Sequence, residues 1–145
     1  ALVDRLSAWC HLMRLAGKAG IVLASAESNG AIPVLNYLEK IGCYLGINVV
    51  EKIGVVKIDP SSEERFEEYI DLISQYLGDK QIVKSNEKLE AVFSTMQYIF
   101  ANYPEDHVEH LFWKNNGLLE CNTFQEVLDK QLVFQDVFST QGALV

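Results

Sequence analysis

The chain has 145 residues, of which 49% are hydrophobic and 22% charged, as expected for one soluble domain with a sizeable core. Its net charge of −8, without a lysine or arginine cluster, argues against a nucleic-acid partner. No apolar run approaches the roughly 20 residues that cross a bilayer, and no secretory leader is evident, so we expect no membrane partner. The three cysteines are widely spaced and odd in number, which predicts reduced thiols in a cytoplasmic protein.

The first predicted element is a helix over residues 1–16, ended by Gly17. Apolar residues occupy one face of this helix from its first turn: Leu2, Leu6, Trp9 and Met13. No capping residue precedes that face, although helices normally begin with one. We therefore expect a missing N-terminal half or a partner chain to contribute upstream of this helix.

A strand, a polar turn and a helix are predicted next. Residues 19–25 have the length and β-branched content of a strand that is buried on both faces. Residues 31–45 show helical periodicity, with Pro33 in the first turn and Asn29 or Ser28 as the expected cap. This order makes half of a βαβ unit, in which ligands bind at the carboxyl end of the strand.

A second strand and a third helix should follow. Residues 47–50 are predicted as strand, and 51–58 as an extended continuation that is either an edge strand or an interrupted one. The Asp-Pro-Ser-Ser-Glu-Glu sequence at 59–64 supplies the capping and acidic residues typical of a helix start. This helix should bury an apolar stripe that includes Ile70 and should end at Gly78.

Short helices and turns replace the α/β alternation near residue 80, so we divide the chain into an α/β part (1–80) and a helical extension (81–145). The apolar stripe of a predicted helix over 87–101 is too broad for an exposed helix. It should pack on the α/β part or on a partner subunit, which favours a homo- or hetero-oligomer. Short helices are predicted at 107–117 and 123–130, and the apolar tail after them should dock on its own domain or on a neighbour.

The polar turn is the best candidate for a binding site. Its small side chains would let a ligand approach the backbone, and the amide groups at the following helix start favour an anionic or carbonyl-bearing ligand. The alternative is that the turn only connects a strand to a helix, which by itself requires a cap and a glycine. The candidate site residues are Ser25, Ala26, Glu27, Ser28, Asn29 and Gly30.

Two histidine-containing patterns could form a metal site or an activated thiolate. His107 and His110, three residues apart, could share one helical face and bind a metal with the neighbouring carboxylates. A solvated acidic turn is favoured, because no third ligand can be identified, and we therefore predict no metal site. His11 lies next to Cys10, but adjacent residues on a helix point about 100° apart, so packing is favoured over an activated thiolate.

The order of several short motifs resembles a known family. These motifs are Leu2-Val3-Asp4-Arg5-Leu6, Gly17-Lys18-Ala19-Gly20-Ile21-Val22-Leu23, Tyr37-Leu38, Leu45-Gly46-Ile47-Asn48-Val49-Val50, and Phe112-Trp113-Lys114-Asn115-Asn116-Gly117-Leu118. Together with the small-residue turn, they are similar to the C-terminal half of the flavodoxin-like NAD(P)H-dependent FMN reductase and iron-sulfur flavoprotein family. The match covers roughly residues 1–78, with a weaker echo at 112–118.

The resemblance implies a partial flavodoxin-like three-layer parallel sheet with a helical C-terminal extension. It further implies an FMN-dependent oxidoreductase that uses NAD(P)H as co-substrate and passes electrons to a small-molecule acceptor such as a quinone or flavin. The turn from Ser25 to Gly30 would then lie beside the isoalloxazine ring. The alternative is a non-catalytic flavodoxin-like interaction or scaffold module, because Glu27 stands in a turn that is usually glycine-rich in the family and the phosphate-binding loop is not in this sequence.

Overall fold

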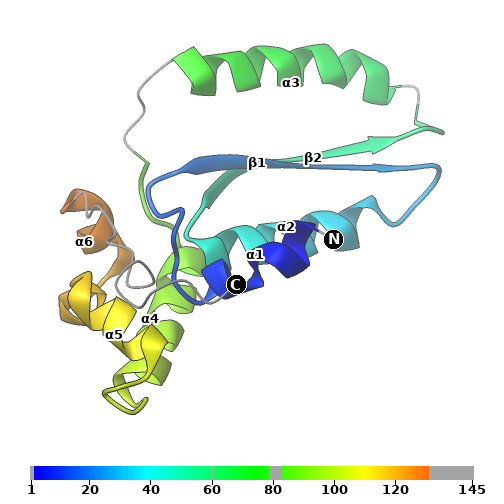
Figure 1. Ribbon diagram of the computed structural model, residues 1–145. Coiled ribbons are helices and arrows are strands. Elements are labelled where there is room, and N and C mark those ends of the chain that lie inside the picture. The colour runs from blue at the N-terminus through cyan, green and yellow to red at the C-terminus, as the bar shows by residue number, and fades with distance from the viewer. Residues whose placement is uncertain (1, 60, 79–82, 131–145) are drawn as a thin grey trace.

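The computed structural model describes residues 2–59, 61–78 and 83–130. These residues form a mixed α/β structure with a small parallel sheet (Figure 1). In chain order the elements are α1 (Leu2–Cys10), β1 (Ala19–Ala26), α2 (Ala31–Leu45), β2 (Asn48–Val56), α3 (Ser61–Gly78), α4 (Glu87–Ala101), α5 (Val108–Asn115), the 3-10 turn η1 (Leu118–Glu120) and α6 (Phe124–Asp129). The predicted C-terminal tail lies outside the described residues. No described helix has the length and apolar character needed to cross a membrane.

The sheet consists of β1 and β2, which pair in parallel and are connected by α2. Figure 1 shows α1 and α2 on one side of the sheet and α3 on the other. The α/β prediction is thus confirmed, whereas the described residues supply two strands and do not show the larger flavodoxin-like sheet. The two-part division of the chain stays a prediction. On its side of the sheet α3 packs on β2 and makes no comparable contact with β1, and Ile70 of α3, which the sequence predicted to be buried, is 49% exposed.

The second strand runs without a break from Asn48 to Val56, so the extended continuation predicted at 51–58 is confirmed as far as Val56. Of the two predicted forms, the interrupted strand was wrong, because β2 is a continuous strand at an edge of the two-stranded sheet. The ladder pairs Gly20 with Val49 but Ile21 with Glu51, which leaves one extra residue on β2 at this point. Such a bulge lets the strand continue past a change of register instead of ending there. The result is a single nine-residue strand that reaches Val56.

The first helix ends at Cys10, and turns instead of helix follow as far as Gly17. Within these turns Met13 is fully buried and adopts a left-handed backbone conformation with φ of 45°, which is incompatible with a helix that continues to residue 16. By leaving the helix there, the chain places Leu12 and Met13 in the core of the helical part. Burial of these two side chains outweighs the local helical preference.

The main core lies among the C-terminal helices. The broad apolar stripe of α4 packs in this core, so it contacts its own chain and not a partner subunit. The stripe therefore no longer supports the expectation of an oligomer. Trp113 of α5 lies at the centre of the core, with its ring centroid 5.5 Å from that of Phe93 and 5.3 Å from that of Phe100. The core also contains Cys43 of α2, so the helical part is packed onto the α/β part.

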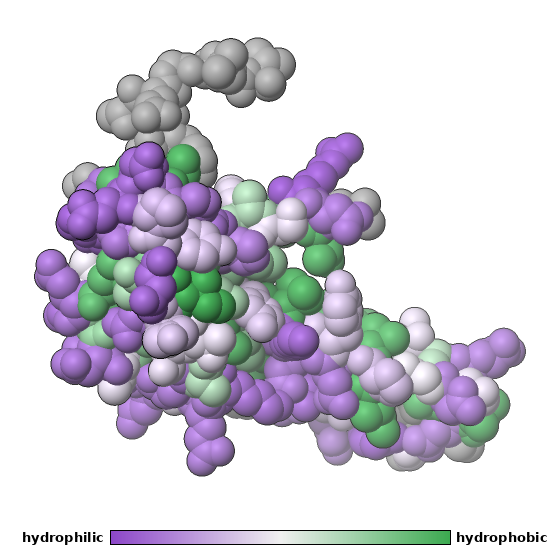
Figure 2. Space-filling model, turned by 90° about the horizontal axis from the view of Figure 1, so that it is seen from below, coloured by the Kyte–Doolittle hydropathy of each residue, from purple (hydrophilic) through white to green (hydrophobic). Residues whose placement is uncertain are grey.

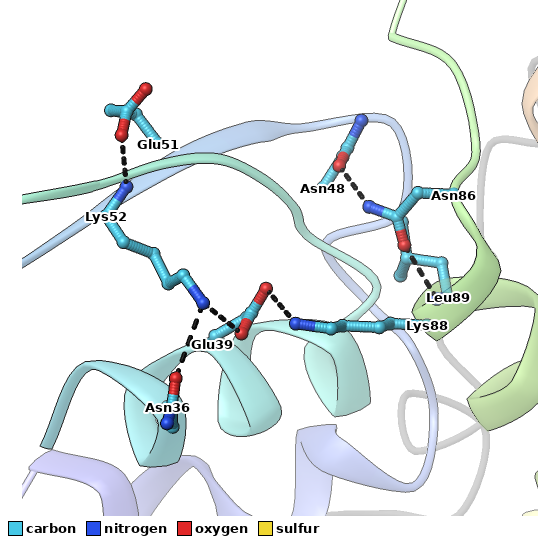
Figure 3. A network of polar contacts seen from close by, with 8 residues as sticks. All are labelled: Asn36, Glu39, Asn48, Glu51, Lys52, Asn86, Lys88 and Leu89. Atoms are coloured by element: carbon cyan, nitrogen blue, oxygen red, sulfur yellow. Dashed lines mark hydrogen bonds and ion pairs between the residues drawn. The ribbon is translucent and has the colours of Figure 1, made fainter. Parts of the chain in front are cut away.

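Polar contacts reinforce this packing (Figure 3). Glu39 of α2 binds Lys88 of α4 at 2.6 Å and Lys52 of β2 at 3.0 Å. Asn86 donates to Asn48 at 2.7 Å and also caps α4 by accepting from the Leu89 amide. The hydrogen bonds from the two lysines, that of Lys88 first, lower the pKa of Glu39. This carboxylate therefore joins three elements while charged.

Candidate functional site

The candidate site lies where both strands end. β1 stops at Ala26 and β2 at Val56, and the chain continues side by side for two more residues. The Lys57 amide donates to the Ala26 carbonyl at 3.0 Å, and the Ile58 amide to the Glu27 carbonyl at 3.2 Å. The parallel pairing thus carries Lys57 to the turn that follows β1.

An open pocket of about 370 Å³ lies at this edge, lined by Ser25, Ala26, Glu27 and Lys57. Three of the six predicted site residues therefore share it. Ser28, Asn29 and Gly30 are exposed beside it and do not line it. Sequence analysis missed Lys57, although its position directly after the second parallel strand is the signal that could have identified it.

The start of α2 corrects another prediction. Neither Asn29 nor Ser28 is the cap: the cap position belongs to Gly30, which has φ of 95° and makes no side-chain hydrogen bond. A residue with a positive φ is most easily glycine, and it turns the chain into the helix within one residue. No side chain caps the free backbone amides in the first turn of α2. Pro33 has no N–H, so the free amides in this turn are those of Ala31 and Ile32.

Small residues hold the turn against the sheet. Ala24 of β1 packs with Ala31 and Leu35 of α2, and all three are buried. A Cβ added at Gly54 of β2 would lie 3.4 Å from Leu35 and 3.7 Å from Ala31. The first turn of α2 therefore lies close to both strands, and its position is set by packing.

The two charged side chains of the pocket, Glu27 and Lys57, form a long and exposed ion pair. Glu27 Oε1 lies 3.4 Å from Lys57 Nζ, and the side chains are 80% and 78% exposed. An ion pair this exposed contributes little to stability and separates readily. The pocket can therefore present an acceptor at Glu27 and a cation at Lys57 to a polar ligand.

Two of the three histidines lie near the carboxylate of Glu109, His11 with its Nδ1 at 2.7 Å and His107 with its Nδ1 at 3.9 Å. His107 caps α5, with its Nδ1 accepting from the Glu109 amide at 3.3 Å, whereas His110 is buried with its Nδ1 2.8 Å from the Phe100 carbonyl. In the described residues His107 and His110 therefore have different hydrogen-bond partners. The described residues contain no group of three or more side chains placed to hold a metal ion.

Cys10, Cys43 and Cys121 are not paired with one another in the structure. Cys43 and Cys121 are buried, and burial raises the pKa of the Cys43 thiol. Burial also raises the pKa of the half-buried Cys10 thiol. His11 contacts Glu109 and Cys10 does not join that contact, so the adjacent pair gives no sign of an activated thiolate.

Comparison with models of known protein families gave no match, and comparison with curated proteins gave none either.

Proposed function

We propose that this chain is the C-terminal part, or a split subunit, of a flavodoxin-like FMN-dependent NAD(P)H oxidoreductase. The observation that carries the proposal is the pocket at the carboxyl ends of two parallel strands, where open α/β sheets bind their ligands. Helices on both sides of the sheet are consistent with a three-layer architecture that further strands would complete.

The residues present fit one edge of a flat heteroaromatic ring. Ser25 and Ala26 of the pocket lining are small enough for the ring to approach the backbone. Lys57 can hold negative charge on the ring system, and Glu27 can accept from a ring N–H once the ion pair opens. The flavin supplies the hydride and electron chemistry when bound, and these residues bind, orient and tune it.

The described lining of the pocket holds no second cation for a phosphate group. Its lining contributes one cation, Lys57, which the proposal assigns to the ring. The phosphate of FMN would therefore be held by residues beyond this pocket. This division of the cofactor site agrees with a split subunit that shares the cofactor with another polypeptide.

The test is a titration of FMN with the purified chain, followed by flavin fluorescence and visible absorption. We expect saturable quenching that weakens at least roughly fivefold in Lys57→Gln, because a charge-assisted contact is lost. Lys18→Gln is the matched control: it removes an exposed lysine at the opposite end of β1 and should change nothing. No quenching, or equal quenching in both variants, would contradict the proposal.

A second candidate function is a non-catalytic scaffold. The specific observation in its favour is that Glu27 and Lys57 already pair across the pocket. Protein that takes up no FMN, and whose Glu27→Gln variant takes up none either, would support this candidate. FMN uptake restored by Glu27→Gln would instead indicate that the carboxylate opposes a pocket otherwise suited to flavin.

A further inference from the structure

The sequence contains two Asn-Gly pairs, Asn29-Gly30 and Asn116-Gly117. In such a pair the backbone nitrogen of the glycine can attack the side-chain amide carbon of the asparagine. Glycine permits this approach best, because it has no Cβ and adopts backbone conformations that other residues avoid. The structure places the two pairs in opposite environments, so that one pair serves as a control for the other.

The first pair lies in the turn between β1 and α2, and both of its residues are exposed. Gly30 occupies the cap position of α2, where a backbone amide has no partner inside the helix. Within the described ranges, no backbone carbonyl outside the helix accepts from the Gly30 amide, and the Asn29 side chain makes no hydrogen bond. The attacking nitrogen and the attacked amide are therefore both free to meet.

The second pair is held in place. Asn116 is 7% exposed, and its Nδ2 donates to the Phe112 carbonyl at 2.8 Å. The Gly117 amide donates to the Lys114 carbonyl at 3.1 Å. A Cβ added at either glycine would meet no atom within 4 Å, so open space around the glycine does not distinguish the two pairs. Burial and hydrogen bonds do, because reaction at Asn116 requires that both bonds break.

We propose that Asn29 is a site of spontaneous deamidation, which introduces a second carboxylate into the turn beside Glu27. The Gly30 nitrogen loses its proton and forms a bond to Cγ of Asn29, and the side-chain nitrogen leaves with that proton as ammonia. The product is a five-membered succinimide, which water then opens. The net reaction converts an amide and one water into a carboxylic acid and ammonia, so it needs neither an oxidant nor a cofactor.

The start of α2 favours this reaction. The positive end of a helix dipole stabilises negative charge, here on the deprotonated Gly30 nitrogen and on the oxygen of the tetrahedral intermediate. Water that attacks the side-chain carbonyl of the ring gives aspartate, and water that attacks the main-chain carbonyl gives isoaspartate, which adds one CH₂ to the backbone directly before α2. Either product makes the turn beside the pocket more acidic.

The test is peptide mapping by tandem mass spectrometry after the full chain has been incubated at mildly alkaline pH. We expect Asn29 to deamidate at least roughly tenfold faster than Asn116 in the folded chain, because Asn116 reacts only after local opening. In guanidinium the two sites should react at similar rates, since glycine follows both. Asn29 should yield both aspartate and isoaspartate, and its rate should rise with pH, because the attacking nitrogen is deprotonated.

Variants connect the site to a change in the intact chain. An acidic form should accumulate on ion-exchange chromatography of the wild type, and at least roughly tenfold more slowly in Asn29→Gln, whose longer side chain is less well placed to close the ring. The matched control is Asn36→Gln, which changes an exposed asparagine on α2 that tyrosine follows. Asn36→Gln should accumulate the acidic form as fast as the wild type.

Three results would overturn the proposal. The first is deamidation of Asn29 and Asn116 at equal rates in the folded chain. The second is a rate at Asn29 that folding lowers at least roughly tenfold relative to guanidinium, which would show that the turn protects it. The third is aspartate without isoaspartate, which would indicate direct hydrolysis in place of the succinimide. None of these measurements involves FMN, so this proposal and the proposed function can fail separately.

Discussion

Replacement of Glu39 by glutamine should destabilise the fold by about 1.5–2 kcal/mol at pH 7. Glu39 has 14% of its side chain exposed and binds two lysines, Lys88 at 2.6 Å and Lys52 at 3.0 Å. Lys88 is 60% exposed, so its ion pair should contribute about 0.5–1 kcal/mol. Lys52 is 36% exposed, so solvent screens its charged hydrogen bond to Glu39 less strongly. This hydrogen bond should contribute about 1 kcal/mol to stability.

The pH dependence of this effect has a defined sign. The two lysines lower the pKa of Glu39 in the folded chain relative to the unfolded chain. The stabilisation is therefore present above the unfolded value, about 4.3 for glutamate, and is lost as the pH falls through the folded value. The difference between wild type and Glu39→Gln should accordingly disappear in acid.

The assay is urea unfolding followed by far-UV circular dichroism at pH 7 and at pH 3, with a double-mutant cycle of Glu39→Gln and Lys88→Gln. We expect a coupling of about 0.5–1 kcal/mol at pH 7 and a smaller one at pH 3. A coupling below about 0.3 kcal/mol at pH 7 would refute the reasoning, since values that small are typical of residues that do not interact. A coupling as large at pH 3 as at pH 7 would refute it as well.

Three further predictions concern the backbone and the thiols. Asn86→Ala should cost about 1 kcal/mol in urea unfolding because it removes the cap of α4, whereas Asn29→Ala should cost little; equal costs would contradict the assigned caps. Gly46→Ala should cost at least about 2 kcal/mol, because φ is 85° and the new Cβ would lie 2.9 Å from backbone atoms; an unchanged midpoint would show that the turn can relax. Cys43 and Cys121 should react with a thiol reagent at least roughly tenfold more slowly in the folded chain than in guanidinium, and fast labelling of both would contradict their burial.

Local signals in the sequence were sufficient where an element carries its own start and stop. Helix α2 matches its predicted range of 31–45, and α4 matches its predicted range of 87–101. Helix α6 lies within its predicted range of 123–130, and Thr123 caps it by accepting from the Glu126 amide. In each case the residues that determine where the helix begins or ends, such as a capping side chain, a glycine or the last residue of the apolar pattern, lie within or next to the helix.

The sequence was insufficient where contacts distant along the chain decide the structure. Met13 leaves the predicted first helix because its side chain is buried among the C-terminal helices. The unbroken β2 depends on a register change against β1, and Lys57 reaches the pocket only through that pairing. Of the predicted site, Ser25, Ala26 and Glu27 line the pocket, while Ser28, Asn29 and Gly30 turn the chain beside it.

Apolar patches also interrupt the polar surface on the side of the molecule seen in Figure 2. On α2, Ile32 is 71% exposed and Val34 48% exposed, and Ile58 after β2 is 68% exposed. Ile58 lies two residues after the end of β2, and Ile32 lies in the first turn of α2. Apolar side chains at these positions are consistent with a flat, largely apolar ligand ring at this edge.

The most direct measurement is a map of amide chemical-shift changes when FMN is added to the isotope-labelled chain. This method detects weak binding, so it applies even if the chain alone holds only one edge of the cofactor. The account predicts saturable shifts confined to residues 25–32 and to Lys57, with the amino-terminal end of the sheet unaffected. Shifts at other sites, or no shifts at millimolar FMN, would contradict a flavin site at the carboxyl edge of the sheet.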